Sequence, residues 1–503
     1  MTTDEGQHVF ISYVREDKDQ VDRLCNMLTA AQIPFWRDMQ DLGPGDWWKL
    51  KIREAIRNDA LVFLACFSDN SRGRQKNNMN EEINLAVEEL RKMPPGHTWM
   101  IPVRFDEGVV PEWELGAGRS LNDVNRVDLF GESYTNNAVS LISAIHRIMG
   151  ESPKPATTRA LVDEARLDER PELLRKLTKE MLMDSSRRID LDDLIVQETR
   201  SIIKFLTNDE RYSKSLLNGT NEENHATLVR LANENWEVVR PFCYSLAVAA
   251  RWGEPDSIAP WISGIKSIVT TATKHQDGYK NLSNLRHIAA LAVISVAALT
   301  CSAHSKWANF RALLAEPNVP DKYRDGETMG ILEATAYWKP FESSESTANI
   351  FSKAETTDGE LSKLIDIYVR QTSGNLYTPV ADWLHAVLAP VFDDQFTDRE
   401  EYDREYLKAE VMLGVTSQDV VLQNARKLGH DTTYARSHWF GRSTWASRYA
   451  RQSPVTLLEA DIKIEGASWP PIRGGLFGSN ELRALQAVKA YNEDFVEISK
   501  NRL

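Results

Sequence analysis

The sequence predicts an α/β domain built on a five-stranded parallel sheet, followed by a mainly α-helical region. In residues 1–150, short apolar runs alternate with amphipathic segments, and the run ALVFLACF (60–67) is apolar on both faces. A strand with no polar face is typical of a sheet covered by helices on both sides, which is the parallel βα architecture. Beyond residue 160, helical spacing continues while strand-like runs become scarce. We therefore expect a flavodoxin-like N-terminal domain and a helical C-terminal region.

The expected elements of the first domain follow one another with short connections. The β-rich runs predict five strands: HVFISY (8–13), IPFWRD (33–38), ALVFLACF (60–67), TWMIPVRF (98–105) and VNRVDLF (124–130). The segments with apolar residues at helical spacing predict four helices, at 17–31, 47–58, 81–93 and 136–149. Each helix follows a strand, as a parallel sheet requires.

A chain of 503 residues exceeds one ordinary core, so at least two domains are expected. GESPKPATTRA (150–160) contains two prolines and no apolar periodicity, which indicates a linker. The segment 341–360 is rich in small polar residues and indicates a second, weaker domain boundary within the helical region. The predicted organisation is a first domain at 1–150, a linker at 151–160, and helical domains at 161–340 and 341–503, with continuity between these two as the alternative.

Composition excludes several classes of protein. A formal net charge of -13 makes nucleic acid an unlikely partner, because binding to phosphate backbones depends on Lys and Arg. The four cysteines (Cys25, Cys66, Cys243 and Cys301) have no CxxC spacing, so neither a disulfide framework nor a metal site is predicted. No secretory signal is visible in MTTDEGQHVF. These features predict a cytoplasmic protein without a metal or cofactor.

The most apolar stretch is IAALAVISVAALTCSA (288–303). It is shorter than the ~20 residues that a bilayer requires, and it is rich in Ala, Ser and Thr. We therefore predict a buried packing helix here, with membrane contact as the less favoured alternative.

In an open parallel sheet, ligands bind outside the carboxyl ends of the strands where the strand order reverses. For a flavodoxin-like order, that point lies between the strands at 8–13 and 60–67. Ser12, Tyr13 and Arg15 follow the first of these strands, and Ser68 follows the second. We expect these residues to border a single crevice.

Two adjacent carboxylates open the next predicted helix, in NEEINLAVEEL (80–90). Glu82 lies four residues before Ala86, on a stripe of small residues that faces inward, whereas Glu81 is turned about 100° away. A carboxylate in the first turn is kept ionised by the helix dipole and could stabilise a sugar that becomes cationic during bond cleavage. Position alone favours simple helix stabilisation, since Glu is common in first turns.

The segment RDMQDLGPGDWW (37–48) shifts that balance toward a binding site. It is a Gly/Pro turn that ends in two adjacent tryptophans, Trp47 and Trp48, which cannot both face the same side of a helix. An exposed indole beside the crevice could stack on a cationic ring or contact another copy of the domain.

Four motifs in order along the chain resemble a bacterial Toll/interleukin-1 receptor (TIR) domain over about residues 6–150: HVFISYVRED, PFWRDMQDLGPGDWW, IREAIRNDALVFLACFS and NEEINLAVEEL. Ser12 and Tyr13 match the family's motif after the first strand, the segment from Asp38 to Trp48 matches its loop after the second strand, and Glu82 matches its catalytic glutamate. The Trp usually found a few residues before that glutamate is absent here, where the chain has QKNNMN (75–80), and Trp47 or Trp48 could substitute for it in holding the substrate.

The resemblance implies an NAD⁺ glycohydrolase, with NAD⁺ as substrate and Glu82 as its catalytic residue. By position, Tyr13, Leu42, Gly45 and Trp47 would line the nucleotide site or the contact between domains. The resemblance further implies self-association through TIR domains and a role in antiviral defence. For the helical region, which the resemblance does not cover, we expect either detection of an unidentified activator, a protein or a nucleotide signal, or a part in self-association. A noncatalytic scaffold that acts by TIR–TIR contact is the alternative, and a nucleoside deoxyribosyltransferase-like domain is a third.

Overall fold

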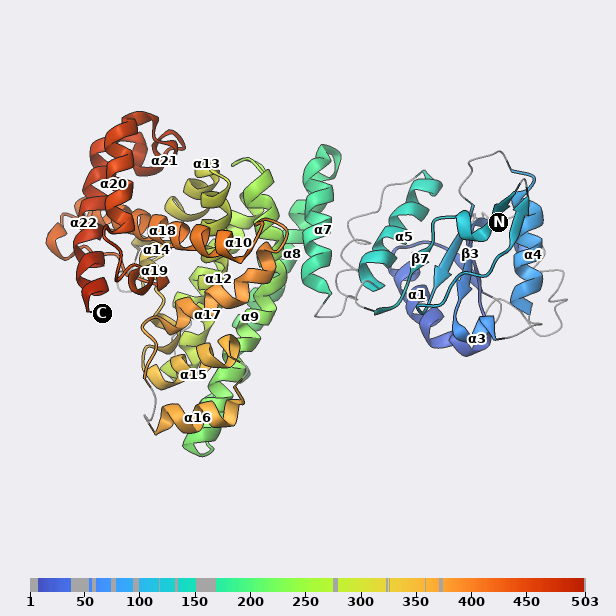
Figure 1. Ribbon diagram of the computed structural model, residues 1–503, viewed down its shortest axis with the longest axis horizontal. Coiled ribbons are helices and arrows are strands. Elements are labelled where there is room, and N and C mark those ends of the chain that lie inside the picture. The colour runs from blue at the N-terminus through green and yellow to red at the C-terminus, as the bar shows by residue number, and fades with distance from the viewer. Residues whose placement is uncertain are drawn as a thin grey trace. The chain divides into compact units, whose positions relative to one another are not determined.

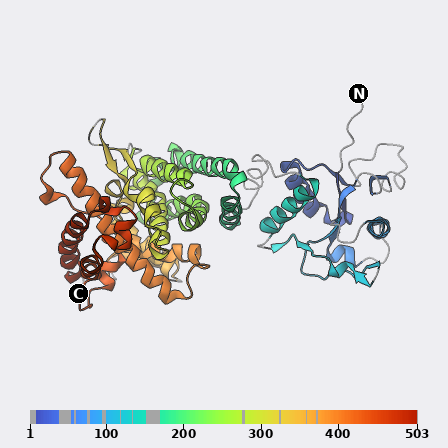
Figure 2. The same ribbon diagram turned by 90° about the horizontal axis from the view of Figure 1, so that it is seen from above.

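The computed structural model describes residues 8–37, 54–56, 60–73, 78–93, 99–116, 118–131, 134–150, 169–274, 279–322, 324, 326–357, 359–370 and 374–501. Its contacts divide the chain into two compact units, Met1–Leu173 and Leu174–Leu503. Figures 1 and 2 show an α/β first unit and a helical second unit. The predicted linker at 151–160 lies outside the described residues.

The first unit contains the predicted five-stranded parallel sheet. Its strands are β1 (His8–Ser12), β2 (Phe35–Arg37), β3 (Ala60–Phe67), β4 (Met100–Arg104) and β7 (Val127–Asp128). The order across the sheet is β2-β1-β3-β4-β7, and every neighbouring pair is parallel. The chain steps outward from β1 to β2 and then returns to β3 on the other side. The reversal of strand order therefore lies between β1 and β3, as predicted.

Helices cover the sheet on both faces, which explains the two-sided apolar strands. Figures 1 and 2 show α1 (Lys18–Ala30) and α5 (Tyr134–Met149) on one face and α4 (Asn78–Leu90) on the other. Side chains alternate along the strands, so Phe10, Phe63 and Ala65 pack in one core with α4. The short helix α3 (Asp69–Arg72) follows β3, and β5 (Glu114–Gly116) pairs with β6 (Arg119–Ser120) in a small hairpin.

Helix α4 begins at Asn78, three residues earlier than predicted. Met79 is buried in the same core as Ile83 and Ala86, so the apolar spacing extends the helix toward its N-terminus. Of the predicted helix at 47–58, the structure describes only residues 54–56.

The second unit is mainly helical, as predicted. Its longest helices are α8 (Arg188–Leu206), α9 (Asn221–Trp252), α10 (Ala259–Lys274), α12 (His287–Ala303), α18 (Arg399–Lys427) and α22 (Glu481–Lys500). Shorter helices include α15 (Glu345–Thr356), α16 (Leu361–Val369), α17 (Pro379–Leu388) and α20 (Pro454–Glu465). A small hairpin joins β8 (Asn318–Pro320) to β9 (Thr328–Gly330). Residues 341–360, where the sequence predicts a weaker domain boundary, include α15, which packs on α17 and α9.

The apolar helix predicted at 288–303 forms the centre of the second unit. Helix α12 packs against α9, α10 and α18. Among the described residues, Lys280–Ala303 is the one helical stretch long and apolar enough to cross a membrane, and 94% of its apolar window is buried inside the protein. This burial agrees with the predicted packing role of the helix.

Candidate functional site

The candidate site is built around Glu82 and Ser12. The Ser12 hydroxyl donates a hydrogen bond to Oε2 of Glu82 at 2.5 Å, across 70 residues of sequence. Ser12 is the last residue of β1, so this contact lies at the carboxyl end of a strand that borders the reversal of strand order. A hydroxyl that donates to a carboxylate fixes the orientation of that carboxylate.

Local periodicity explains why these two side chains meet. Ser12 points to the same face of the sheet as Phe10, which is the face that α4 covers. On α4, Glu82 and Ala86 are buried and Glu81 is exposed, the separation that helical spacing predicts. Glu82 therefore points toward the sheet.

Glu82 lies beyond the first turn of α4, so the helix dipole does not hold it as the sequence predicts. Because α4 begins at Asn78, Glu81 is the acidic residue in its first turn, and the dipole effect falls off beyond that turn. The group that orients Glu82 is the Ser12 hydroxyl, and not the helix dipole.

A second buried carboxylate, Asp17, joins the segments that follow β1 and β3. Asp17 is fully buried, and its two oxygens accept hydrogen bonds from the Ser68 hydroxyl and from the Asn70 amide. The sequence predicts a helix start at Asp17, a position where Asp normally caps the helix. Here its side chain makes no capping bond and instead bridges two loops, which the sequence analysis missed.

Ser68 lies beside this reversal of strand order, but its hydrogen bonds are to the protein. It is the N-cap of α3 and forms a capping box with Ser71, while its hydroxyl also donates to Asp17. Ser68 is 3% exposed. Contact between Ser68 and a substrate stays a prediction. In this structure, the hydrogen bonds of Ser68 hold the loop after β3 in place.

The other residues predicted after β1 differ in exposure. Tyr13 is partly buried. Arg15 lies in the short 3₁₀ turn Arg15–Asp17, where its side chain is exposed. Among the described residues, no ion pair or hydrogen bond to its guanidinium is found.

Five predicted residues lie outside the described residues: Asp38, Leu42, Gly45, Trp47 and Trp48. Their assignment to the site rests on the sequence alone. The first half of QKNNMN (75–80) also lies outside, and its last three residues are described.

Ion pairs hold the neighbouring end of the sheet. Arg104 of β4 forms a two-pronged ion pair with Asp128 of β7, with both N···O distances at 2.6 Å. This hydrogen bonding lowers the pKa of Asp128. Arg72 bridges two carboxylates through one nitrogen, which donates to both Asp69 and Asp106. These paired groups stabilise the loops beside the site and are not free to bind a substrate.

The site is closed in the single chain. Glu82 is 4% exposed and Ser12 is 1% exposed. A ligand can therefore reach the carboxylate of Glu82 only after residues around it move. Within the described residues, no cluster of three or more His, Cys, Asp or Glu could hold a metal ion.

The protein-family comparison agrees with this architecture. A family model described as the TIR domain matches residues 9–142, which extend from β1 into α5. Among curated proteins, none matches the chain significantly. The family match identifies a TIR domain in the first unit and leaves the helical unit unassigned.

Proposed function

We propose that the TIR domain of this chain cleaves NAD⁺ at the bond between nicotinamide and ribose. The observation that supports this best is the hydrogen bond from Ser12 to Glu82 at the reversal of strand order, where open α/β sheets bind their ligands. It joins Glu82, which matches the family's catalytic glutamate, to Ser12, which the position at the strand end predicts to border the site. Glu82 is the proposed catalytic residue and Ser12 its positioning residue.

The chemistry requires a fixed negative charge. As the bond between the ribose C1′ and the nicotinamide nitrogen breaks, the electron pair leaves with nicotinamide, which departs as a neutral molecule. Positive charge develops on the ribose, and the ionised Glu82 stabilises it. Water then attacks C1′ and loses a proton, giving ADP-ribose, while capture by an adenine nitrogen would give a cyclic isomer.

The low exposure of Glu82 means that the proposed activity requires a change of conformation. Because Glu82 is 4% exposed, a ribose cannot contact its carboxylate in the single chain. We propose that the domain exchanges between this closed form and an open form that exposes Glu82, and that self-association of TIR domains favours the open form. An enzyme that consumes NAD⁺ is harmful when unregulated, so control by assembly fits such an activity.

The family resemblance also supports a proposal for the cellular role. We propose that this protein is a cytoplasmic antiviral effector, and that its helical unit detects an unidentified activator or drives oligomerisation. The burial of α12 inside the helical unit is compatible with a protein that does not enter a membrane.

The test compares two neighbouring glutamates on α4. Concentrated or crowded full-length protein should consume NAD⁺ and release nicotinamide, measured by mass spectrometry. Glu82→Ala and the nearly isosteric Glu82→Gln should each lower the rate at least ~100-fold, a typical loss for a group that stabilises charge in the transition state. Glu81→Ala is the matched control, because Glu81 is exposed on the same turn, and it should retain full activity.

A noncatalytic scaffold is the second candidate, and the burial of Glu82 favours it. A buried carboxylate that accepts a hydrogen bond can serve only to join α4 to β1. If the domain is a scaffold, no assembled state consumes NAD⁺. Glu82→Gln should then reduce self-association only by the amount that its loss of folding stability explains. Full activity of folded Glu82→Gln would remove the site assignment.

A further inference from the structure

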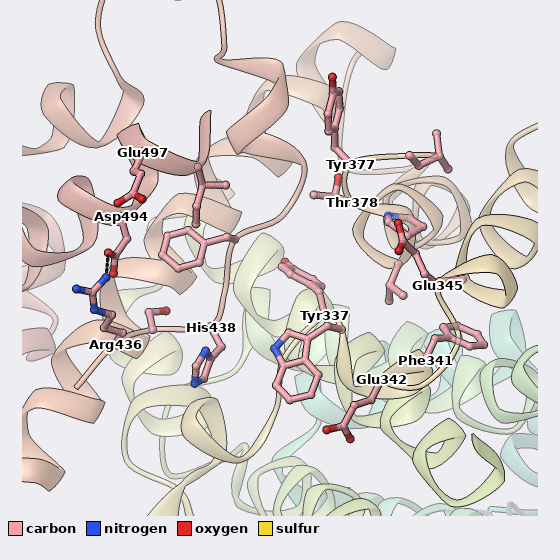
Figure 3. Close-up of a pocket in the computed structure, with 18 residues that line it drawn as sticks. Tyr337, Phe341, Glu342, Glu345, Tyr377, Thr378, Arg436, His438, Asp494 and Glu497 are labelled. Carbon is pink, nitrogen blue, oxygen red and sulfur yellow. Dashed lines mark hydrogen bonds and ion pairs between the residues drawn. The ribbon is translucent and has the colours of Figure 1, made fainter. Parts of the chain in front are cut away.

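The helical unit contains a cavity of about 680 Å³ that the proposed TIR activity does not use. Its walls come from five parts of the chain: residues 337–342, the start of α15, residues 376–380, residues 436–440 and the last turns of α22. Figure 3 shows Asp494 and Glu497 on one side of the cavity and Glu345 on the other, with Tyr337 between them. A volume of this size suits a small organic molecule.

The charge of the walls is strongly negative. Four carboxylates line the cavity (Glu342, Glu345, Asp494 and Glu497), against one guanidinium, that of Arg436. Arg436 forms its ion pair with Asp494, so one carboxylate is neutralised within the wall.

The other three carboxylates have no cation among the described residues. Glu342 accepts a hydrogen bond from the Asn284 amide at 3.2 Å, and Glu345 accepts one from the Asn375 amide at 2.9 Å. Glu497 forms no ion pair or hydrogen bond with any described side chain. Amide donors orient a carboxylate without neutralising it. The cavity therefore presents three negative charges to a ligand.

Aromatic rings supply the apolar part of the same cavity. Tyr337, Trp338, Phe341, Tyr377 and Phe440 line it. Trp338 is 46% exposed and Tyr377 is 52% exposed, large values for aromatic side chains. Exposed aromatic faces attract cations, and the effect adds to the attraction of nearby carboxylates.

We propose that this cavity binds a small organic cation, an ammonium or guanidinium group carried on an apolar or aromatic body. Unpaired carboxylates and aromatic faces both favour a positive ligand. An anionic nucleotide would meet three unpaired negative charges, so this cavity disfavours that class of ligand. The inference concerns the helical unit and does not depend on the activity of the TIR domain.

One protein cation lies close to the cavity. The Lys339 ammonium is 5.0 Å from the centroid of the Trp338 ring, and Lys339 lines an adjoining cavity. Even if its charge is counted, the walls remain negative. Its position shows that the Trp338 ring accommodates a cation.

The test uses three indole probes that differ in charge. Tryptamine carries an ammonium, tryptophol has a neutral hydroxyl in its place, and indole-3-acetate carries a carboxylate. Titration calorimetry on the full-length protein should show tryptamine binding at least ~10-fold more tightly than tryptophol, with indole-3-acetate weakest. Raising the salt concentration should weaken tryptamine binding only, since salt screens partly exposed charges.

Variants assign the binding to this cavity. The double variant Glu345→Gln/Glu497→Gln keeps the side-chain shapes and should weaken tryptamine about 10-fold without changing tryptophol. Tyr377→Leu should weaken tryptamine severalfold. Glu493→Gln is the matched control, since Glu493 is exposed on α22 but does not line the cavity, and it should bind normally.

Three results would overturn the proposal. Equal affinities for tryptamine and tryptophol would show that charge is irrelevant. Unchanged tryptamine binding in the folded double variant would place the probe elsewhere. If neither tryptamine nor spermidine binds at millimolar concentration, the cavity is not a site for organic cations.

Discussion

Replacing Ser12 by alanine removes the hydroxyl that donates to the buried carboxylate of Glu82 at 2.5 Å. Both residues are almost completely buried, so water cannot easily replace the lost donor. A hydrogen bond to a charged group typically contributes about 1.5–3 kcal/mol. We expect Ser12→Ala to lower the free energy of opening of β1 and α4 by that amount.

Hydrogen exchange with mass spectrometry measures this effect in the full-length protein. Unfolding of a chain with two compact units is not two-state, so a local measurement is preferable to a single melting temperature. Since 1.4 kcal/mol corresponds to a factor of ten, the slowest amides of β1 and α4 should exchange ~10-fold to ~150-fold faster. Amides of α12, which belongs to the other unit, are the internal control and should not change.

Two results would refute this reasoning. Unchanged protection of α4 in Ser12→Ala would show that the hydrogen bond contributes little. A second test repeats Ser12→Ala in a Glu82→Ala background, where the hydroxyl has lost its acceptor and the substitution should cost much less. Equal costs in both backgrounds would show that the hydroxyl acts through another group.

Three further predictions concern the rest of the chain. Burial of His287 lowers its pKa from 6.5 to about 3. Between these values the unfolded chain binds one proton more than the folded chain, so stability is lost as the pH falls, by about 1.4 kcal/mol per unit. Urea unfolding at pH 6.5 and 5 should show this loss, and His287→Leu should reduce it. Gly414→Ala should destabilise the helical unit by about 1–3 kcal/mol in urea, because the new Cβ would lie 2.2 Å from the Tyr491 hydroxyl oxygen. Gly374→Ala is the control, since its Cβ would contact nothing within 4 Å. Burial raises the pKa of the Cys66 thiol well above its usual value, so iodoacetamide at pH 8 should modify Cys66 only after unfolding, and rapid labelling of the native protein would contradict that burial.

Much of the site's framework could be predicted from residue patterns. The apolar run at 60–67 predicted a strand in a sheet covered by helices on both faces, and β3 lies between β1 and β4 in such a sheet. The spacing from Glu82 to Ala86 predicted which of two adjacent glutamates faces inward. The start of α4 could not be placed as well, because Met79 stabilises the first turn only through its contact with the core.

The partners of the site's polar groups could not be predicted in this way. Asp17 had the sequence context of a helix cap, yet its side chain accepts hydrogen bonds from residues more than 50 positions away. Local sequence patterns predict which face of a helix or strand is buried. They do not predict which residue of another helix or strand will contact that face.

By itself, the sequence determined the strands, the helices and their buried faces, since these follow from the period of apolar residues along a short stretch of chain. Only the tertiary structure decided that Ser12 contacts Glu82, and that four carboxylates and five aromatic rings line one cavity. Such groupings join segments that are tens to more than 100 residues apart in the chain. They depend on how whole elements pack, because the cores are filled by side chains from all of these segments together.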